Sequence, residues 1–127
     1  MVNYYGNGDK TMSIDIATVI RYIRPNSTWS LDGESYEGLT WADPNTEKPT
    51  YDEILAAADE ARLESIAKSK RKERGRLLTD TDWVVVKHNE LGTPIPQEWL
   101  DYRQALRDIP DQTGFPEEID WPQEPES

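Results

Sequence analysis

The chain has 127 residues, of which 35% are hydrophobic and 31% are charged, and its formal net charge is −11. This length fits one small domain or two subdomains that share a modest core, and the low hydrophobic share indicates exposed segments or a partner that covers surface. The negative charge argues against binding to nucleic acids and to anionic membranes, whose phosphates would repel the chain.

Cysteine is absent from the sequence. Disulfides, thiolate metal sites and cysteine nucleophiles are therefore excluded, and a reducing compartment is compatible with the chain. No run approaches the roughly 20 apolar residues that a membrane-spanning helix needs. The first twelve residues lack a basic stretch followed by an apolar core, so we expect a mobile polar lead-in and no signal peptide.

The N-terminal third of the sequence predicts a helix followed by a β-hairpin. Ser13 can cap a helix over residues 14–23, whose isoleucines and valine recur at three- and four-residue spacings, although their β-branched side chains also permit a strand. Pro25 ends this element. Residues 28–41 then alternate apolar and polar residues around Asp32-Gly33, which is typical of two short strands joined by a turn. A lone hairpin is marginal in water, so it must pack on a helix or join another protein's sheet.

A long helix is predicted over residues 50–78. Thr50 and Glu53 form a capping box at its start, and an apolar stripe continues to Ala67. From Lys68 to Arg76 the stripe is replaced by basic residues that still favour a helix. At about 28 residues, roughly 42 Å, this helix would outrun a small core and bridge two subdomains.

The C-terminal part predicts a short strand over residues 83–86, a loop over residues 89–96 and a helix that Pro96 begins and Pro110 ends. Trp99, Tyr102, Leu106 and Ile109 share one face of that helix. Trp83 and Trp99 are expected to pack together. After Asp108 the chain lacks Lys and Arg and is rich in proline, so the tail is expected to be extended. Its acidic residues and the basic run are most simply two solvated charge patches; the alternatives are that the tail folds back onto the basic run or that each meets a separate partner. Trp121 is either a strap over the core or a docking anchor.

The expected fold is therefore α+β and mainly helical. Its four parts are a helix-plus-hairpin subdomain (residues 1–49), a bridging helix (50–78), a small helical subdomain (79–110) and an extended acidic tail (111–127).

Candidate chemical groups are few. Arg103 and Arg107 lie one helical turn apart and can clamp Asp82 or a carboxylate of a partner. His88 is the single histidine, with no nucleophile arrangement near it. The Asp80-Thr81-Asp82 segment lacks the glycine and distal glutamate of a calcium loop, and no glycine loop could cradle phosphate. We expect no enzyme activity, no metal, no cofactor and no small-molecule substrate. An enzyme that uses His88 remains the third-ranked alternative.

The segment from Arg74 to Pro122 resembles the C-terminal region of tailed-phage tail fibre assembly proteins, also called tail assembly chaperones. The resemblance depends on a set of basic, aromatic and apolar residues in a particular order: Arg74, Leu77, Leu78, Thr81, Asp82, Trp83, Pro96, Trp99, Tyr102, Arg103, Leu106, Arg107, Asp108, Ile109, Pro110, Trp121 and Pro122. The upstream segments WSLDGESYEGLTW and KPTYDEI look like the N-terminal part of some members.

This resemblance implies a bacteriophage protein that helps a tail fibre to fold, trimerise or attach. The implied partner is the C-terminal region of the fibre trimer, and the implied location is the host cytoplasm during assembly, with retention at the fibre tip left open. The alternative is a structural virion subunit at the tip that contacts the host surface. The residues expected to bind the fibre come from the first helix and the hairpin: Ile16, Ile20, Trp29, Leu31, Tyr36, Leu39 and Trp41.

Overall fold

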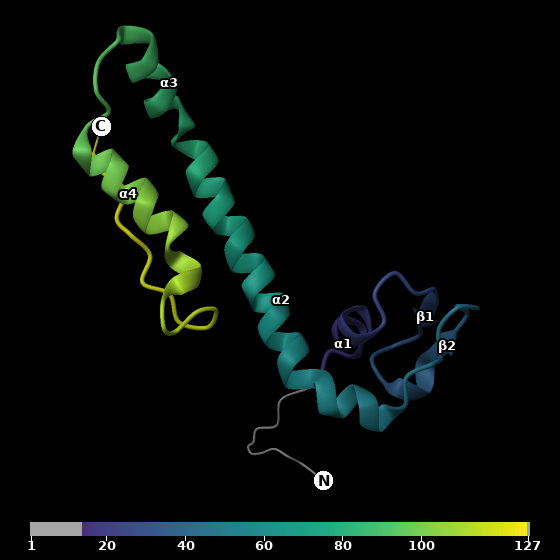
Figure 1. The fold of residues 1–127 in the computed structure, drawn as a ribbon. Coiled ribbons are helices and arrows are strands. Elements are labelled where there is room, and N and C mark those ends of the chain that lie inside the picture. Colours follow the sequence, from purple (N-terminus) through teal and green to yellow (C-terminus); the bar gives the residue numbers. More distant parts are fainter. Residues whose placement is uncertain (1–13, 127) are drawn as a thin grey trace. The chain divides into compact units, whose positions relative to one another are not determined.

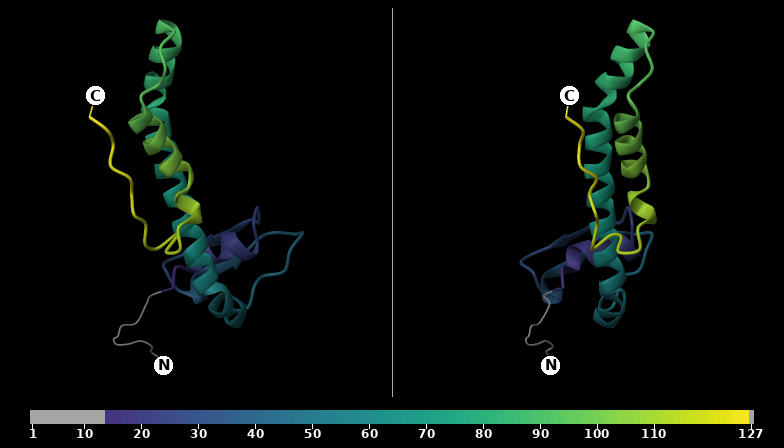
Figure 2. Two further views of the ribbon diagram at one scale, coloured as in Figure 1. Left: turned by 60° about the vertical axis from the view of Figure 1, so that its left-hand side comes forward. Right: turned by 90° about the vertical axis from the view of Figure 1, so that its left-hand side faces the viewer.

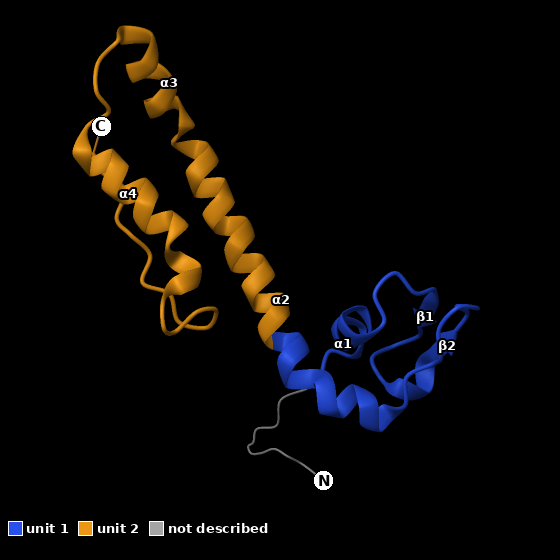
Figure 3. Ribbon diagram, in the orientation of Figure 1, with its two compact units in different colours: residues 1–62 blue, residues 63–127 orange. Residues whose placement is uncertain are grey.

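The computed structural model describes residues 14–126 of the chain. The chain divides into two compact units, residues 1–62 (unit 1) and residues 63–127 (unit 2), which Figure 3 shows in different colours. The described part is mainly helical and contains one two-stranded sheet, so the expected mainly helical α+β class is confirmed. The expected segment boundaries at residues 49, 78 and 110 stay predictions.

Eight elements make up the described chain (Figure 1). In chain order they are α1 (Ile16–Ile23), β1 (Trp29–Leu31), the 3₁₀ turn η1 (Tyr36–Gly38), β2 (Leu39–Trp41), α2 (Tyr51–Asp80), α3 (Asp82–Leu91), α4 (Gln97–Arg107) and the 3₁₀ turn η2 (Ile109–Asp111). Residues of α2 up to Arg62 belong to unit 1, and the rest of this helix belongs to unit 2.

The first helix starts two residues later than the sequence predicted. Asp15 is its N-cap, and its carboxylate accepts hydrogen bonds from the Thr18 backbone N–H at 3.2 Å and from the Thr18 hydroxyl at 2.8 Å. The expected cap, Ser13, lies outside the described residues. Ile16, Val19 and Ile20 are buried, so the predicted apolar face is confirmed.

The predicted hairpin is present, with β1 and β2 antiparallel. Gly33 turns the chain with a φ of 82°, a backbone conformation that glycine adopts without steric cost. Gly38 passes so close to the Asp32 carbonyl that a side chain at this position would collide with it. The apolar side chains of the hairpin face α1 and the start of α2, where the core of unit 1 contains Ile16, Val19, Ile20, Leu39, Ile54 and Ala61.

The start of α2 is fixed by the capping box that the sequence predicted. The Thr50 backbone N–H donates to the Glu53 carboxylate at 3.0 Å, and the Glu53 N–H donates to the Thr50 hydroxyl at 3.1 Å. The same carboxylate accepts from Arg24 at 3.1 Å, which ties the end of α1 to the start of α2. At its other end α2 continues to Asp80, two residues past the predicted end.

In unit 2 the second half of α2 lies alongside α4, as both Figure 1 and Figure 2 show. The predicted apolar face of α4 is confirmed, because its residues form the buried core together with Val84 of α3. That core contains Val84, Trp99, Tyr102, Leu106 and Ile109.

The strand predicted at residues 83–86 is wrong, because these residues belong to α3. The loop predicted over residues 89–96 is present over residues 92–96, whereas residues 89–91 form the end of α3, which stops at Leu91 with Gly92 in the left-handed conformation. A valine costs only a few tenths of a kcal/mol in a helix. A strand would need a pairing partner, and the described residues of unit 2 contain none. Burial of Val84 against α4 therefore outweighs the strand propensity of the valines.

The acidic tail is bound to its own unit by apolar contacts. Phe115, Ile119 and Trp121 pack against the core of unit 2, and the Arg71 guanidinium lies 5.3 Å from the centre of the Phe115 ring. The Gln112 side chain donates to the Asp120 carbonyl at 2.9 Å and accepts from its N–H at 2.8 Å. Trp121 is therefore a strap over the core, which was one of the two expected roles.

Three carboxyls of unit 1 make its stability depend on pH. Hydrogen bonds from the Thr18 hydroxyl and backbone N–H lower the pKa of Asp15, and one from the Asn45 backbone N–H lowers that of Asp43. The pKa of Glu53 is lowered by the Thr50 N–H first and then by Arg24. A carboxyl whose pKa is lower in the folded than in the unfolded chain stabilises the fold at every pH above its unfolded-state pKa. That stabilisation is lost as the pH falls through the folded-state pKa.

We predict that unit 1 loses stability as the pH drops below about 4.5, the ordinary pKa of a glutamate. Circular dichroism melts between pH 7 and pH 3 measure this loss. Glu53→Gln is the matched variant, because glutamine can keep the capping box but carries no charge for Arg24. Its melting temperature should depend less on pH in this range than that of the parent, and identical pH profiles would contradict the assignment of Glu53.

Candidate partner-binding site

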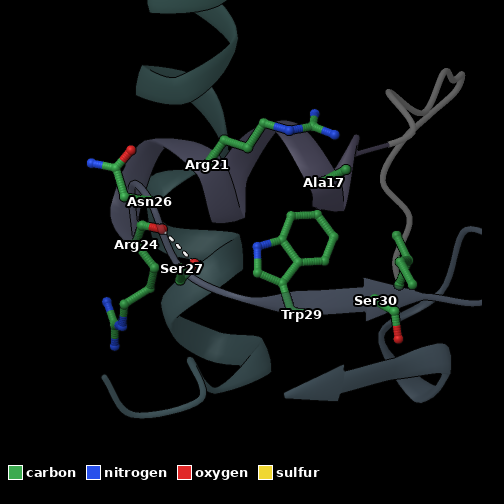
Figure 4. Close-up of a pocket in the computed structure, with 8 residues that line it drawn as sticks. Ala17, Arg21, Arg24, Asn26, Ser27, Trp29 and Ser30 are labelled. Atoms are coloured by element: carbon green, nitrogen blue, oxygen red, sulfur yellow. Dashed lines mark hydrogen bonds between the residues drawn. The ribbon is translucent and has the colours of Figure 1, made fainter. Parts of the chain in front are cut away.

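A groove lies in unit 1 between α1 and β1, and it is the candidate site for a partner. Its volume is about 550 Å³. We call it the edge groove, and Figure 4 shows the residues that line it. They come from α1, the turn that follows and β1: Ala17, Arg21, Arg24, Asn26, Ser27, Trp29, Ser30 and Leu31.

The backbone of β1 presents unpaired hydrogen-bonding groups beside this groove. Backbone hydrogen bonds join Ala42 to Thr28 and Asp32 to Gly38. Ser30 and Thr40 lie opposite each other midway between these two pairs. Such pairs recur at every second position of an antiparallel ladder, so the N–H and C=O groups of Trp29 and Leu31 point away from β2. Within residues 14–126 no third strand pairs with β1.

Two arginines of α1 and its C-cap line the groove, and they differ in their contacts. The Arg24 side chain donates to the carbonyls of Glu47 at 3.0 Å and Ile23 at 3.3 Å as well as to Glu53. The Arg21 guanidinium instead lies 5.6 Å from the centre of the Trp29 ring. Arg24 is therefore a structural residue, whereas Arg21 is exposed at the mouth of the groove.

The seven residues expected to bind a partner divide into two groups. Ile16, Ile20 and Leu39 are buried in the core of unit 1, so the folded unit does not offer them to a partner. Trp29, Leu31, Tyr36 and Trp41 are half-buried at the edge of that core. A role in partner binding stays a prediction for these four residues.

The polar groups of two of these aromatic residues are already bonded within unit 1. The Tyr36 hydroxyl donates to the Pro49 carbonyl at 2.8 Å, and the Trp41 indole N–H donates to the Thr46 carbonyl at 2.8 Å. Trp29 and Leu31 are the two expected residues that also line the edge groove. Arg21 was not predicted as a site residue, because a charged residue on the polar face of a helix carries no sequence signal of its own.

In unit 2 the residues that carry the family resemblance build a clamp around the break between α2 and α3. Thr81 occupies this break with 1% of its surface exposed, and its hydroxyl donates to the carbonyls of Leu77 and Leu78 at 3.3 and 3.0 Å. Arg103 of α4 donates to the Leu78 carbonyl at 2.9 Å, to the Thr81 hydroxyl at 2.7 Å and to the Asp82 carboxylate at 3.0 Å. We call these four hydrogen-bonded residues, Leu78, Thr81, Asp82 and Arg103, the Arg103 clamp.

The two arginines of α4 therefore have different roles. The Arg103 side chain is only 12% exposed and pairs with Asp82, as expected. Arg107 is exposed, and its guanidinium donates to the Gln104 side chain at a long 3.5 Å. The backbone carbonyl of Arg107 accepts a hydrogen bond from Arg74 of α2 at 3.1 Å.

The aromatic residues of the resemblance differ in their burial. Trp99 and Tyr102 are core residues, and burial, with a further contribution from Glu124, raises the pKa of Tyr102. Trp83 contacts Trp99 edge to face at 5.9 Å, as expected, but is 48% exposed. Three other large apolar side chains of unit 2 are also exposed: Val86, Leu91 and Leu100.

The described residues offer no candidate metal centre. No group of three or more potential metal ligands occurs among them. The His88 ring nitrogen Nδ1 lies 2.8 Å from the Thr93 hydroxyl, a local contact at the end of α3. Among residues 14–126 no helix is both long and apolar enough to cross a membrane.

The Arg103 clamp gives a stability prediction with a matched control. Arg103→Ala leaves the Leu78 carbonyl without this donor and removes the partner of Asp82, so we expect a loss of about 2–3 kcal/mol in the free energy of unfolding of unit 2. Arg107→Ala, on the same helix, should change it by less than about 0.5 kcal/mol. Urea denaturation followed by tryptophan fluorescence measures both, and equal effects of the two substitutions would contradict the clamp.

Comparison with known proteins found a similarity that lies within unit 2. A protein-family model described as phage tail assembly chaperone protein matches residues 67–126. Searches of curated proteins and of solved structures found no match. The matched segment contains all four residues of the Arg103 clamp, the whole of α3 and α4, and the strap around Trp121. Residues 67–126 of the chain are therefore similar to the phage tail assembly chaperone family.

Proposed function

We propose that the protein is a chaperone for the phage tail fibre, which binds the C-terminal region of the fibre through unit 1 and assists its folding, trimerisation or attachment. The family of unit 2 implies a tail protein as the partner and a non-enzymatic role. The observation that carries the choice of unit 1 is the unpaired backbone edge of β1 beside the edge groove.

The physical need for such a helper follows from the way β-rich fibre tips assemble. Trimers of intertwined strands depend on contacts between residues far apart in sequence or on different chains, and such contacts form slowly. Until they form, unpaired strand edges are exposed and can aggregate. An extended segment of the fibre can pair with the free edge of β1, which satisfies its backbone groups while the trimer forms.

The charge of the chain suits this role. A net charge of −11 on 127 residues makes complexes repel one another, which keeps a partly assembled fibre soluble. The proposed location is accordingly the cytoplasm of the infected host during assembly.

The second candidate is a structural virion subunit at the fibre tip. The observation that favours it is the exposed apolar surface of unit 2, which includes Trp83 and Leu91, 48% and 63% exposed. On this alternative these side chains belong to the surface that contacts the host. Mass spectrometry of purified virions and a cell-binding assay with the isolated protein separate the two candidates, because a chaperone that departs is absent from virions and does not bind cells.

Co-expression tests the chaperone proposal. The fibre gene of the same phage is expressed with and without this chain, and the yield of soluble fibre trimer is measured by gel filtration. We expect a severalfold higher yield with the chain, and stable co-purification with the intact fibre but not with a fibre that lacks its C-terminal region. Equal yields in both cultures would count decisively against the proposal.

A further inference from the structure

We infer that the edge groove receives an extended partner segment with one Asp or Glu side chain that pairs with Arg21. This inference rests on the proposed docking through unit 1 and adds the chemistry of the segment that docks. Three observations carry it: the position of Arg21, the open backbone of β1, and the charge of the chain.

Within residues 14–126 the Arg21 guanidinium has no carboxylate partner. Figure 4 shows its side chain extending along α1 above the Trp29 ring. Its contact with Trp29 is a cation–π contact, and no carboxylate of the described residues lies within 4 Å of it. Asp15, on the same helix, is hydrogen-bonded to Thr18, and these hydrogen bonds contribute more than Arg21 to its lowered pKa. The aromatic ring fixes the arginine and leaves its hydrogen-bond donors free for a ligand.

The neighbouring arginine shows what a structural arginine looks like in this unit. Arg24 reaches two backbone carbonyls and the Glu53 carboxylate, so its donors are used within the fold. Arg21 lines the same groove with none of these contacts. The difference marks Arg21 as the residue available to a ligand.

The geometry of strand addition brings a partner side chain close to Arg21. A segment that pairs with the outward backbone groups of Trp29 and Leu31 would place a side chain beside Trp29, at the roughly 5 Å that separates neighbours across strands. This side chain would lie on the face of the hairpin that carries the Trp29 ring, and the Arg21 guanidinium is 5.6 Å from the centre of that ring. A carboxylate at this position can therefore accept hydrogen bonds from Arg21.

The charge of the chain limits the ligand to a single carboxylate. A tract of acidic residues would be repelled by a protein of net charge −11. A single carboxylate opposite Arg21 forms an ion pair with it, and one negative charge is repelled only slightly by the rest of the chain. A side chain is favoured over a chain terminus, because pairing on both sides of Trp29 requires the strand to continue past it.

Peptide binding to the full chain tests this inference. The probes are acetylated and amidated twelve-residue peptides that cover the C-terminal region of the fibre, labelled with fluorescein and followed by anisotropy. For the peptide that binds most tightly, each Asp or Glu is replaced in turn by Asn or Gln. We expect one replacement to weaken binding about tenfold, as the loss of a charge-assisted pair would.

The protein side uses Arg21→Gln with Lys48→Gln as its matched control. Lys48 also lies over an aromatic ring of unit 1, at 5.0 Å from the centre of Tyr36, but does not line the groove. Both substitutions remove one positive charge. Arg21→Gln should lower the affinity for the parent peptide about tenfold. It should leave unchanged the affinity for the peptide that lacks the critical carboxylate. Lys48→Gln should leave both affinities unchanged, and circular dichroism confirms that each variant is folded.

The outcomes separate the inference from the function it rests on. If the parent chain binds neither the peptides nor the intact fibre, the proposed function fails, and the inference fails with it. If peptides bind but Arg21→Gln and the carboxylate replacement weaken binding independently, the pairing with Arg21 is overturned while the proposed function stands. An equal loss from Lys48→Gln also overturns it, because the effect would then come from net charge.

Discussion

Unit 2 depends on the hydrogen bonds of one side chain, Arg103. A helix that stops and restarts leaves backbone carbonyls without partners at the break, and burial of these groups costs free energy. Arg103 donates to the Leu78 carbonyl, the Thr81 hydroxyl and the Asp82 carboxylate. It therefore gives these acceptors at the break a hydrogen-bond donor and holds α4 next to the break. Arginine suits this role because its planar guanidinium presents several donors at fixed angles, which lysine lacks.

Unit 1 reaches stability in another way, because its apolar core is small. Polar contacts supplement the core. They are the local capping box of Thr50 and Glu53, and two contacts between residues distant in sequence, the Arg24–Glu53 ion pair and the hydrogen bond from Tyr36 to the Pro49 carbonyl. These contacts join α1, the hairpin and the start of α2. They leave the edge of β1 unpaired within the described residues, and that edge is where an added strand gains the most hydrogen bonds.

Patterns between near neighbours in the sequence predicted most of the fold. The capping box, the hairpin and the apolar face of α4 each depend on residues that are close together in the sequence, and all three are present. The strand predicted over residues 83–86 was wrong because burial of Val84 against α4 depends on contacts distant in sequence. The site was harder to predict, since an apolar face looks the same whether it covers a core or binds a partner. Ile16, Ile20 and Leu39 belong to the core, and Arg21 becomes notable only where folding places it over Trp29.

The family match and the edge groove fall in different units, and this separation has a functional consequence. Residues 67–126 lie within unit 2, whereas Arg21, Trp29 and Leu31 lie in unit 1. The core of unit 2 tolerates little change because its side chains are buried, and the clamp because Arg103 and Thr81 are hydrogen-bonded to each other and to their neighbours. The groove residues of unit 1 are partly exposed, so substitutions there cost less stability. If unit 1 binds the fibre as proposed, a substitution at Arg21 can change which segment binds while the core of unit 2 stays the same.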